Sequence, residues 1–403
     1  MPSDRGHRAA AESPTRAASR TRRLDLDVVR GAAIVLALGW HFSGPTGNVV
    51  LDALQWPGQH LGWAGVDLFF VLSGFLMGRL VLGEHGRTGT FDGRRFSLRR
   101  ILKLWPVLYL FLAVQVLFGS ESLGSFLWQN ALHVQNIAGT SFAHLWSLAV
   151  EEHFYLALAL LFPVFVKRGG SLKLFAGILA GVLAAELAFR LLGSWSGVSD
   201  VRLQWRTWFH LDGLAAGVLL AVVSVRWPER FQALQDRRRT LLAVLAAGIA
   251  VLTVIGKSGP LGSTIGFTVA WMTAAAALLL TYRATWVPRV RWIAAPVAAL
   301  GRYSYGIYIW HIFAAGTVLG WLGMDREVST PFAQAVKYAS AIVVGVAATL
   351  LVERPVLRLR DRIWPGTDDE QRSVSEQPAP APQVLPQEVP VLQAPVLLAR
   401  LAA

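Results

Sequence analysis

Long apolar segments recur along most of the chain, and they constrain its fold more than any other feature of the sequence. A helix needs about 20 mainly apolar residues to cross the hydrocarbon core of a bilayer. Segments of suitable length lie at residues 28–46, 62–82, 101–118, 143–166, 172–192, 207–225, 240–256, 264–282, 303–322 and 333–352. We therefore predict an all-α integral membrane protein, a bundle of about ten transmembrane helices. The short segment 240–256 and the apolar stretch 293–300 leave nine or eleven spans as alternatives.

The overall composition supports this prediction. Of the 403 residues, 54% are hydrophobic and 16% are charged, whereas a soluble chain of this length usually carries more charge. The sequence contains no cysteine, which excludes a thiolate nucleophile, a disulfide and a cysteine-ligated metal centre. We expect no bound metal or cofactor.

Lys and Arg residues are unevenly distributed between the loops that join the predicted spans. On one side of the bundle they gather in residues 1–27, 83–100, 167–173, 226–239, 283–291 and 353–362. The loops on the other side contain only Arg202, Arg206, Lys257 and Arg326. Because cytoplasmic loops carry an excess of Lys and Arg, we predict that both termini are cytoplasmic. The formal net charge of +13 has the same origin and does not indicate a nucleic-acid partner.

The two ends of the chain differ in composition from its middle. Residues 1–24 are polar and rich in Arg, and we predict a disordered basic cytoplasmic arm there. Residues 365–403 are rich in proline, which predicts a disordered cytoplasmic tail. These boundaries leave a single transmembrane domain at residues 25–364.

One loop contains a fragment of a known phosphate-binding pattern. The stretch VLTVIGKS, around Lys257, includes Gly-Lys-Ser but lacks the upstream glycine that a phosphate-binding loop requires. We therefore assign Lys257 to an ordinary outer loop.

Arg30 and His41 lie within the first predicted span, where an ionisable side chain is costly unless it faces the protein interior. Eleven steps of about 100° return a helix to within roughly 20° of its starting direction. Both side chains therefore lie on one face of the helix, about 16 Å apart along its axis. We interpret this face as lining a functional site.

The predicted topology sorts the intramembrane ionisable residues into two layers. A titratable layer, in or near the outer half of the membrane, contains His41, Asp67, Glu151, Glu152, His210, Asp212 and His311. A cationic layer, at the cytoplasmic ends of the spans, contains Arg30, Arg79, Arg99, Arg100 and Lys103. For each cation, snorkelling to the lipid phosphates is the alternative interpretation. Together the layers predict a cavity that binds an anionic ligand near the cytoplasm and performs acid–base chemistry deeper in the membrane.

Six short motifs in the chain occur in the order found in a known family. They are RGAAIVLALGWH at 30–41, GVDLFFVLSGFLMG at 65–78, RRILKLWP at 99–106, HLWSLAVEEHFYL at 144–156, SYGIYIWH at 304–311 and ERP at 353–355. On these motifs the chain resembles the membrane-bound acyltransferase family 3. Members of that family transfer acyl groups, commonly acetyl from acetyl-CoA, to hydroxyls of sugars, surface glycans or secondary metabolites.

The resemblance implies roles for several residues. His41 would be the catalytic base that activates the acceptor hydroxyl. Arg30 and the pair Arg100 and Lys103 would contact the phosphates of the acyl-CoA donor, which needs fixed cations. Glu151 would be a second catalytic residue that either orients His41 or holds the acceptor.

Other candidates are less specific. Asp67, Glu152, Tyr305 and His311 are further candidates for substrate binding, and Ser73 is either a site residue or a helix-packing residue. The tryptophans at 40, 105, 146 and 310 fit a sugar site and a membrane-interface belt equally well.

The chain departs from the family pattern at two positions. Lys103 stands where the family usually has a second arginine, and lysine does not bind phosphate through two parallel hydrogen bonds. His153 follows the glutamate pair where the family more often has glutamine. The first change replaces a bidentate phosphate contact by a single point charge at Lys103, and the second adds a candidate base.

We therefore predict an integral membrane O-acyltransferase in the plasma membrane of a bacterium. Its expected substrates are acyl-CoA, with acetyl-CoA preferred, and a sugar-containing acceptor, either a cell-surface glycan or a glycosylated secondary metabolite such as a macrolide. We favour direct transfer over an acyl-histidine intermediate. The alternative function is a proton-coupled transporter or flippase of a glycolipid or natural product, which also uses intramembrane Asp, Glu and His.

Overall fold

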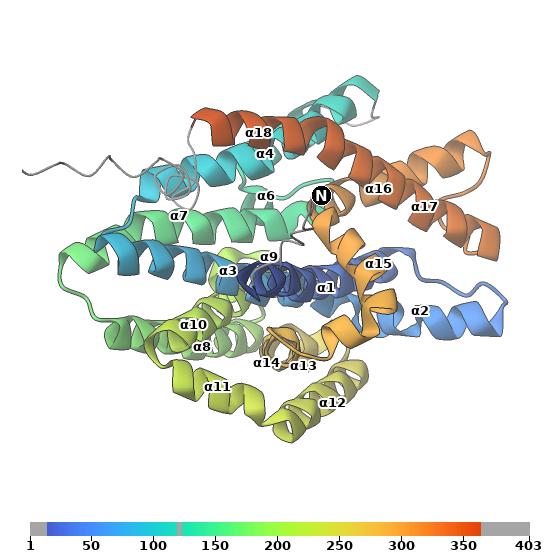
Figure 1. Ribbon diagram of the computed structural model, residues 1–403. Coiled ribbons are helices and arrows are strands. Elements are labelled where there is room, and N and C mark those ends of the chain that lie inside the picture. Colours follow the sequence, from blue (N-terminus) through green and yellow to red (C-terminus); the bar gives the residue numbers. More distant parts are fainter. Residues whose placement is uncertain (1–13, 119–122, 364–403) are drawn as a thin grey trace, which may run out of the picture. The chain divides into compact units, whose positions relative to one another are not determined.

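The computed structural model describes residues 14–118 and 123–363, and every regular element in this part of the chain is helical. Each of the predicted spans coincides with a helix (Figure 1). These helices are α1 (Pro14–Phe42), α3 (Gly65–Thr88), α4 (Gly93–Phe118), α7 (Trp146–Lys167), α8 (Leu172–Trp195), α10 (Asp212–Arg226), α12 (Arg238–Ile255), α14 (Phe267–Thr281), α16 (Ser304–Trp321) and α17 (Pro331–Ala348).

Shorter elements connect these helices. The short α-helices are α2 (Val49–Leu61), α5 (Leu123–Ala131), α6 (Gln135–Ala138), α9 (Asp200–Trp205), α11 (Pro228–Asp236), α13 (Gly259–Leu261), α15 (Arg291–Arg302) and α18 (Arg354–Ile363). The 3₁₀ turns are η1 (Gly62–Ala64), η2 (Ala143–Leu145), η3 (Thr207–Phe209) and η5 (Val287–Val290). Two π-helical turns, η4 (Gly262–Gly266) and η6 (Thr349–Glu353), lie next to α14 and α17.

Within the described residues, seven helical stretches are long and apolar enough to cross a membrane. They are Val49–Thr88, Gly93–Phe118, Ala143–Lys167, Leu172–Trp195, Arg238–Ile255, Gly259–Thr281 and Pro331–Ile363. Helices α1, α10 and α16 are not among them, and α10 has only 15 residues. The multi-pass character is therefore confirmed, whereas the count of ten is not.

The first helix begins earlier than the sequence predicted. It starts at Pro14, so residues 14–24 of the expected disordered arm are helical in the structure. Residues 1–13 of that arm and the expected tail at 365–403 lie outside the described residues.

Helices α3 and α10 pack backbone against backbone. A Cβ atom at Gly74 of α3 would lie 2.1 Å from the carbonyl oxygen of Leu214 on α10. A Cβ atom at Gly217 of α10 would likewise lie 2.1 Å from the carbonyl oxygen of Val71 on α3. Small residues allow such an approach between membrane helices. The two helices run in the same direction, so their N-terminal ends meet, and this brings Asp67 close to His210.

Buried apolar side chains form two large clusters among the described residues. One cluster, which includes Phe75, Val218 and Leu278, joins α3, α10 and α14. The other, which includes Leu38, Phe111 and Ile307, joins α1, α4 and α16. The ionisable residues of interest project from these same helices, so the packed clusters fix their positions.

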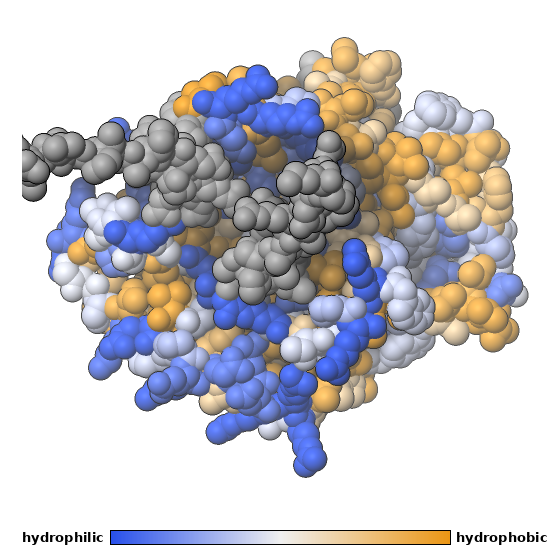
Figure 2. Space-filling view, viewed as in Figure 1, coloured by the Kyte–Doolittle hydropathy of each residue, from blue (hydrophilic) through white to orange (hydrophobic). Residues whose placement is uncertain are grey.

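Much of the outer surface is hydrophobic, as a lipid-facing surface requires. Trp195, Val254 and Trp321 are 86%, 85% and 81% exposed. Figure 2 shows a large hydrophobic area on the side where α16 and α17 lie, and hydrophilic side chains gathered along the lower edge near α11 and the start of α12. Separation of this kind is typical of a protein embedded in a bilayer.

Candidate active site

The largest group of predicted site residues lines one cavity, which we call the cationic cavity. Its volume is about 360 Å³. Five residues predicted from the sequence contribute to its wall: Arg30, Arg100, Lys103, Glu151 and Tyr305. They come from α1, α4, α7 and α16, so the fold brings together residues that are up to 275 positions apart in the sequence.

The cations of this cavity are held by neighbouring groups. Nη1 of Arg30 lies 2.6 Å from Oδ1 of Asp27, one turn earlier on α1. The guanidinium of Arg100 lies over the rings of Phe96 and Tyr155, 5.8 and 5.6 Å from their centroids. Arg100 and Lys103 are three residues apart on α4, so both project from the same helical face.

Glu151 is fixed by two hydroxyl groups. Oγ of Ser73 on α3 donates to Oε1 of Glu151 over 2.5 Å, and the hydroxyl of Tyr155 donates to the same oxygen. The hydroxyl of Tyr305 donates to the carbonyl oxygen of Leu104 over 2.5 Å, which ties α16 to α4. These bonds hold the carboxylate and the cations around one space.

A second cavity, which we call the imidazole cavity, has a volume of about 180 Å³. Its ionisable lining residues are His41, Asp67, His144, His210 and Lys257. Its aromatic lining residues are Trp40, Trp63, Trp146, Trp205, Phe267 and Tyr308. Val66 and Tyr308 line both cavities, so the two spaces share a wall.

Three imidazole rings gather at the end of α1. The ring centroid of His41 lies 5.0 Å from that of His311 and 6.5 Å from that of His144. Nε2 of His144 faces the carbonyl oxygen of Ile309 at 3.1 Å, and Nδ1 of His311 faces that of Tyr308 at 2.6 Å. Because a carbonyl only accepts, both of these ring nitrogens carry hydrogen.

His41 differs from its two neighbours in its surroundings. His144 and His311 are buried and fixed by α16, whereas the surface of His41 is open to the cavity. His41 makes no hydrogen bond to any described residue of the chain. Nε2 of His311 is also buried without a partner among the described residues. An accessible imidazole beside fixed ones is suited to take up a proton from a bound ligand.

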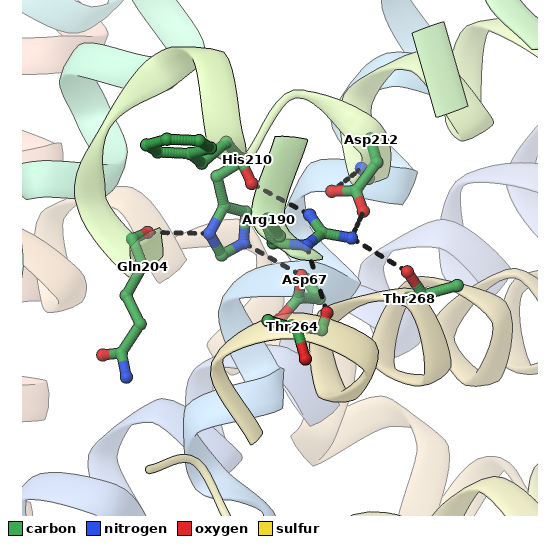
Figure 3. A network of polar contacts seen from close by, with 9 residues as sticks. Asp67, Arg190, Gln204, His210, Asp212, Thr264 and Thr268 are labelled. Atoms are coloured by element: carbon green, nitrogen blue, oxygen red, sulfur yellow. Dashed lines mark hydrogen bonds and ion pairs between the residues drawn. The ribbon is translucent and has the colours of Figure 1, made fainter. Parts of the chain in front are cut away.

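A buried polar network supports Asp67 in this cavity (Figure 3). Nε2 of His210 lies 3.2 Å from Oδ1 of Asp67, and Nδ1 of His210 lies 2.7 Å from the carbonyl oxygen of Gln204. Both ring nitrogens therefore face acceptors, so Asp67 and His210 share a proton between them. Oδ2 of Asp67 has no hydrogen-bond partner in the described structure.

The same network contains a fully buried ion pair. Nη2 of Arg190, on α8, lies 2.7 Å from Oδ2 of Asp212 at the start of α10. Arg190 also donates to Oγ1 of Thr268 and to the carbonyl oxygens of Thr264 and Phe209. Each of its three nitrogens therefore has a partner, which a buried guanidinium requires. The pair fixes α8 and α14 against the N-terminal end of α10, two residues after His210.

Comparison with known proteins identifies the family. A family model described as "Acyltransferase domain", of acyltransferase family 3, matches residues 23–354. The chain belongs to this family. It is therefore a membrane acyltransferase, as the six sequence motifs predicted. No solved structure matches the chain.

Similar proteins in bacteria carry names of the same kind. The chain is 28% identical over 372 residues to BcsY of Komagataeibacter xylinus, whose name describes a membrane-bound transacylase, with 85% of each chain covered. It is 24% identical over 315 residues to the peptidoglycan O-acetyltransferase OatA of Listeria monocytogenes, with 71% of this chain and 48% of OatA covered. It is 23% identical over 314 residues to the O-acetyltransferase OatA of Staphylococcus aureus, with 71% of this chain and 49% of OatA covered. The acyltransferase thus spans about half the length of the OatA relatives.

The sequence left two roles open for Glu151, orienting His41 or holding the acceptor, and the structure places the two residues in different cavities. Glu151 lines the cationic cavity and His41 lines the imidazole cavity, and no hydrogen bond joins them in the described part of the acyltransferase. His311, in contrast, contacts His41 directly. Glu152 lines neither cavity, and its Oε1 is buried without a hydrogen-bond partner among the described residues.

Sequence reasoning missed several residues of the acyltransferase site. The sequence did not mark His144, Tyr155 or Arg190 as functional, because a single His, Tyr or Arg in a span is compatible with packing or with a helix end. Lys257 did carry a signal. It is one of only a few basic residues on the predicted outer side, and it stands between glycines that allow an unusual loop.

Proposed function

We propose that this acyltransferase is an integral membrane O-acyltransferase that moves an acetyl group from acetyl-CoA to a hydroxyl of a sugar. The observation that carries the proposal is the shared wall of the two cavities at Val66 and Tyr308. One cavity offers fixed cations, and the other offers an accessible imidazole. A reaction between an anionic donor and a hydroxyl acceptor needs both.

The cationic cavity is the proposed donor site. Arg30, Arg100 and Lys103 line it, and charge-assisted hydrogen bonds from such groups are the usual means of holding phosphate. Its volume of about 360 Å³ falls within the range of roughly 300–1,000 Å³ that small-molecule sites occupy. The apolar side chains of Phe69, Leu72 and Leu76 fit the methylene and methyl groups of the pantetheine arm.

The imidazole cavity is the proposed site of acyl transfer. An acceptor hydroxyl oxygen attacks the thioester carbonyl carbon while His41 removes the hydroxyl proton. The tetrahedral intermediate then collapses, the bond from carbon to sulfur breaks, and the CoA thiolate takes the proton from His41. The rings of His311 and His144 pack against the imidazole of His41 and keep it directed into the cavity.

The acceptor is proposed to be a sugar, in a cell-surface glycan or in a glycosylated secondary metabolite such as a macrolide. The aromatic wall of the imidazole cavity suits the apolar face of a sugar ring, and the free Oδ2 of Asp67 suits a sugar hydroxyl. The names of the two OatA relatives support an acceptor of this class.

We further propose the topology predicted from the loops, with ten spans and both termini in the cytoplasm of a bacterium. In that orientation the cationic cavity lies toward the cytoplasm, where acetyl-CoA is made. The transferase would then deliver acetyl groups to the deeper imidazole cavity without export of the donor.

Release of free CoA from acetyl-CoA by the purified, detergent-solubilised protein tests this proposal. Suitable acceptors are the N-acetylglucosamine–N-acetylmuramic acid disaccharide, cello-oligosaccharides and erythromycin. We expect acceptor-dependent release that is lost in His41→Ala and retained in His60→Ala, since His60 lines neither cavity. If the wild-type protein neither binds acetyl-CoA nor releases CoA with any acceptor, the transferase proposal is wrong, and a proton-coupled transporter or flippase becomes the better interpretation.

A further inference from the structure

A short glycine-flanked loop places Lys257 in the imidazole cavity. The loop joins α12 to α13, and both Gly256 and Gly259 have positive φ, +64° and +83°. L-residues with a side chain rarely adopt this conformation, so the two glycines allow the chain to turn inward between the helices. The side chain of Lys257 consequently lines the same cavity as His41, a role that its assignment to an ordinary outer loop did not anticipate.

The loop is fastened to the polar network behind the site. The side-chain amide of Gln204 donates to the carbonyl oxygen of Lys257 over 3.3 Å, and the amide of Gly259 donates to Oδ2 of Asp200 over 2.7 Å. The carbonyl oxygen of Gln204 in turn accepts from His210, the partner of Asp67. The position of Lys257 is therefore built into the fold.

The ammonium group of Lys257 is paired with no described carboxylate, although Asp67 in the same cavity acts on it electrostatically. Nζ of Lys257 lies 5.4 Å from the ring centroid of Trp40, the residue next to His41. Lys257 forms no ion pair with any described residue, and it is the one Lys or Arg among the residues that line this cavity. The ring of Trp40 and the charge of Asp67 compensate this cation only in part, because Oδ1 of Asp67 is already paired with His210. The half-buried ammonium therefore favours a ligand that carries or develops negative charge.

Acyl transfer develops negative charge close to His41. When the acceptor oxygen bonds to the thioester carbonyl carbon, the π electron pair moves onto the carbonyl oxygen, and this oxyanion requires a donor that is already in place. A lysine ammonium is a compact charge with three hydrogen-bond donors. The protein offers no other cation among the lining residues described for this cavity.

We propose that the ammonium of Lys257 stabilises this oxyanion during acyl transfer. The inference rests on the proposed transferase function. It names Lys257 as the group that polarises the thioester carbonyl, whereas His41 acts on the acceptor hydroxyl. Lys257 keeps its protons throughout: it donates to the acyl oxygen while His41 takes the hydroxyl proton, and the oxyanion disappears when the CoA thiolate departs. The negative charge on the acyl oxygen also offsets the positive charge that His41 gains beside Lys257.

The environment of Lys257 gives the proposal a pH signature. Burial lowers the pKa of the Lys257 ammonium below the ordinary lysine value of 10.5. The titratable groups that share its cavity are His41 from α1, Asp67 from α3, His144 from η2, His210 before α10 and Tyr308 from α16. Because the charged form is the active one, activity should fall at alkaline pH as Lys257 loses its proton.

Steady-state kinetics of Lys257→Met and Lys257→Arg, with the acceptor that supports CoA release in the wild-type protein, test the proposal. Loss of one oxyanion donor typically lowers kcat about 10²- to 10³-fold. We expect a loss of this size in Lys257→Met, with KM for acetyl-CoA and for the acceptor changed by less than about threefold. Lys257→Arg should retain more activity than Lys257→Met, and its activity should fall at a higher pH than that of the wild type. Ser258→Ala, in the same loop, is the control and should behave as wild type.

Several outcomes would overturn the proposal. A Lys257→Met protein with near-wild-type kcat shows that the ammonium does not act in the reaction. A defect confined to KM for the acceptor shows that Lys257 binds the acceptor instead. If kcat falls at the same alkaline pH in the wild type and in Lys257→Arg, the proposal is also contradicted. Absence of acyl transfer in the wild type itself is a different result, because it refutes the transferase proposal on which this inference rests.

Discussion

Oγ of Ser73 on α3 lies 2.5 Å from Oε1 of Glu151 on α7, and this hydrogen bond places Glu151 among the cations rather than beside His41. Ser73 is therefore more than a small residue at a helix contact. Its hydroxyl and that of Tyr155 hold one carboxylate oxygen in a fixed direction. Glu151 acts electrostatically on Arg100 and Lys103, which line the same cavity.

Glu151→Gln should therefore weaken binding of the acetyl-CoA donor more than it slows proton removal by His41. We expect KM for acetyl-CoA to rise about tenfold and kcat to fall by less than about threefold, because the amide no longer orients the cations but leaves His41 in place. Initial rates over a range of acetyl-CoA concentrations give both constants. A large loss of kcat with unchanged KM would instead assign Glu151 to the chemical step, as the sequence alone suggested.

Arg100→Met should weaken recognition of the CoA phosphates. A hydrogen bond to a charged group contributes about 1.5–3 kcal/mol, which corresponds to roughly 10- to 100-fold in KM for acetyl-CoA. S-acetylpantetheine lacks the nucleotide and its phosphates, so the variant and the wild type should use this donor almost equally. An equal defect with both donors would show that Arg100 supports the fold or the thioester and not the phosphates.

Asp212→Asn should destabilise the protein strongly. The change leaves the guanidinium of Arg190 buried without its counter-ion, and removing one partner of a buried pair costs about 3–5 kcal/mol. Thermal unfolding in detergent, followed by tryptophan fluorescence, measures the effect. Asp236→Asn is a matched control, since the side chain of Asp236 is exposed and, within the described residues, accepts a hydrogen bond from Gln232 alone. Similar melting temperatures for both variants would contradict a stabilising role for the pair.

The helical architecture was largely predictable from the sequence, because each apolar segment long enough to cross a bilayer coincides with a helix. Of the five cations assigned to one layer, Arg30, Arg100 and Lys103 line one cavity, whereas Arg79 donates to Ser224 elsewhere. Hydropathy and charge are local properties of the chain, and a helix preserves their order along its axis.

The division of the site into two cavities was not predictable in the same way. Depth along a span can be read from the sequence, but the rotation of each helix about its axis depends on packing. Glu151 and His41 were assigned to one depth, yet α7 directs Glu151 toward Ser73. Lys257 was missed because the backbone turn at Gly256 and Gly259, which directs it inward, is set by contacts with α9 that are distant in sequence.

The close contact between α3 and α10 should be sensitive to a single methyl group. A Cβ atom at Gly217 would lie 2.1 Å from the carbonyl oxygen of Val71 and 2.6 Å from the backbone nitrogen of Phe75. Since neither backbone atom can move freely, Gly217→Ala should force the helices apart and lower the free energy of unfolding by about 1–3 kcal/mol.

Gly177 provides a matched comparison for this change. It also lies within a helix, α8, but an added Cβ atom there meets no atom within 4 Å. Gly177→Ala should leave stability unchanged or raise it by up to about 1 kcal/mol, because alanine favours the helix. Separation of α3 from α10 also moves Asp67 away from His210, so Gly217→Ala should lower acyl transfer even where the protein remains folded. If both variants unfold and react alike, the helix pair does not position Asp67.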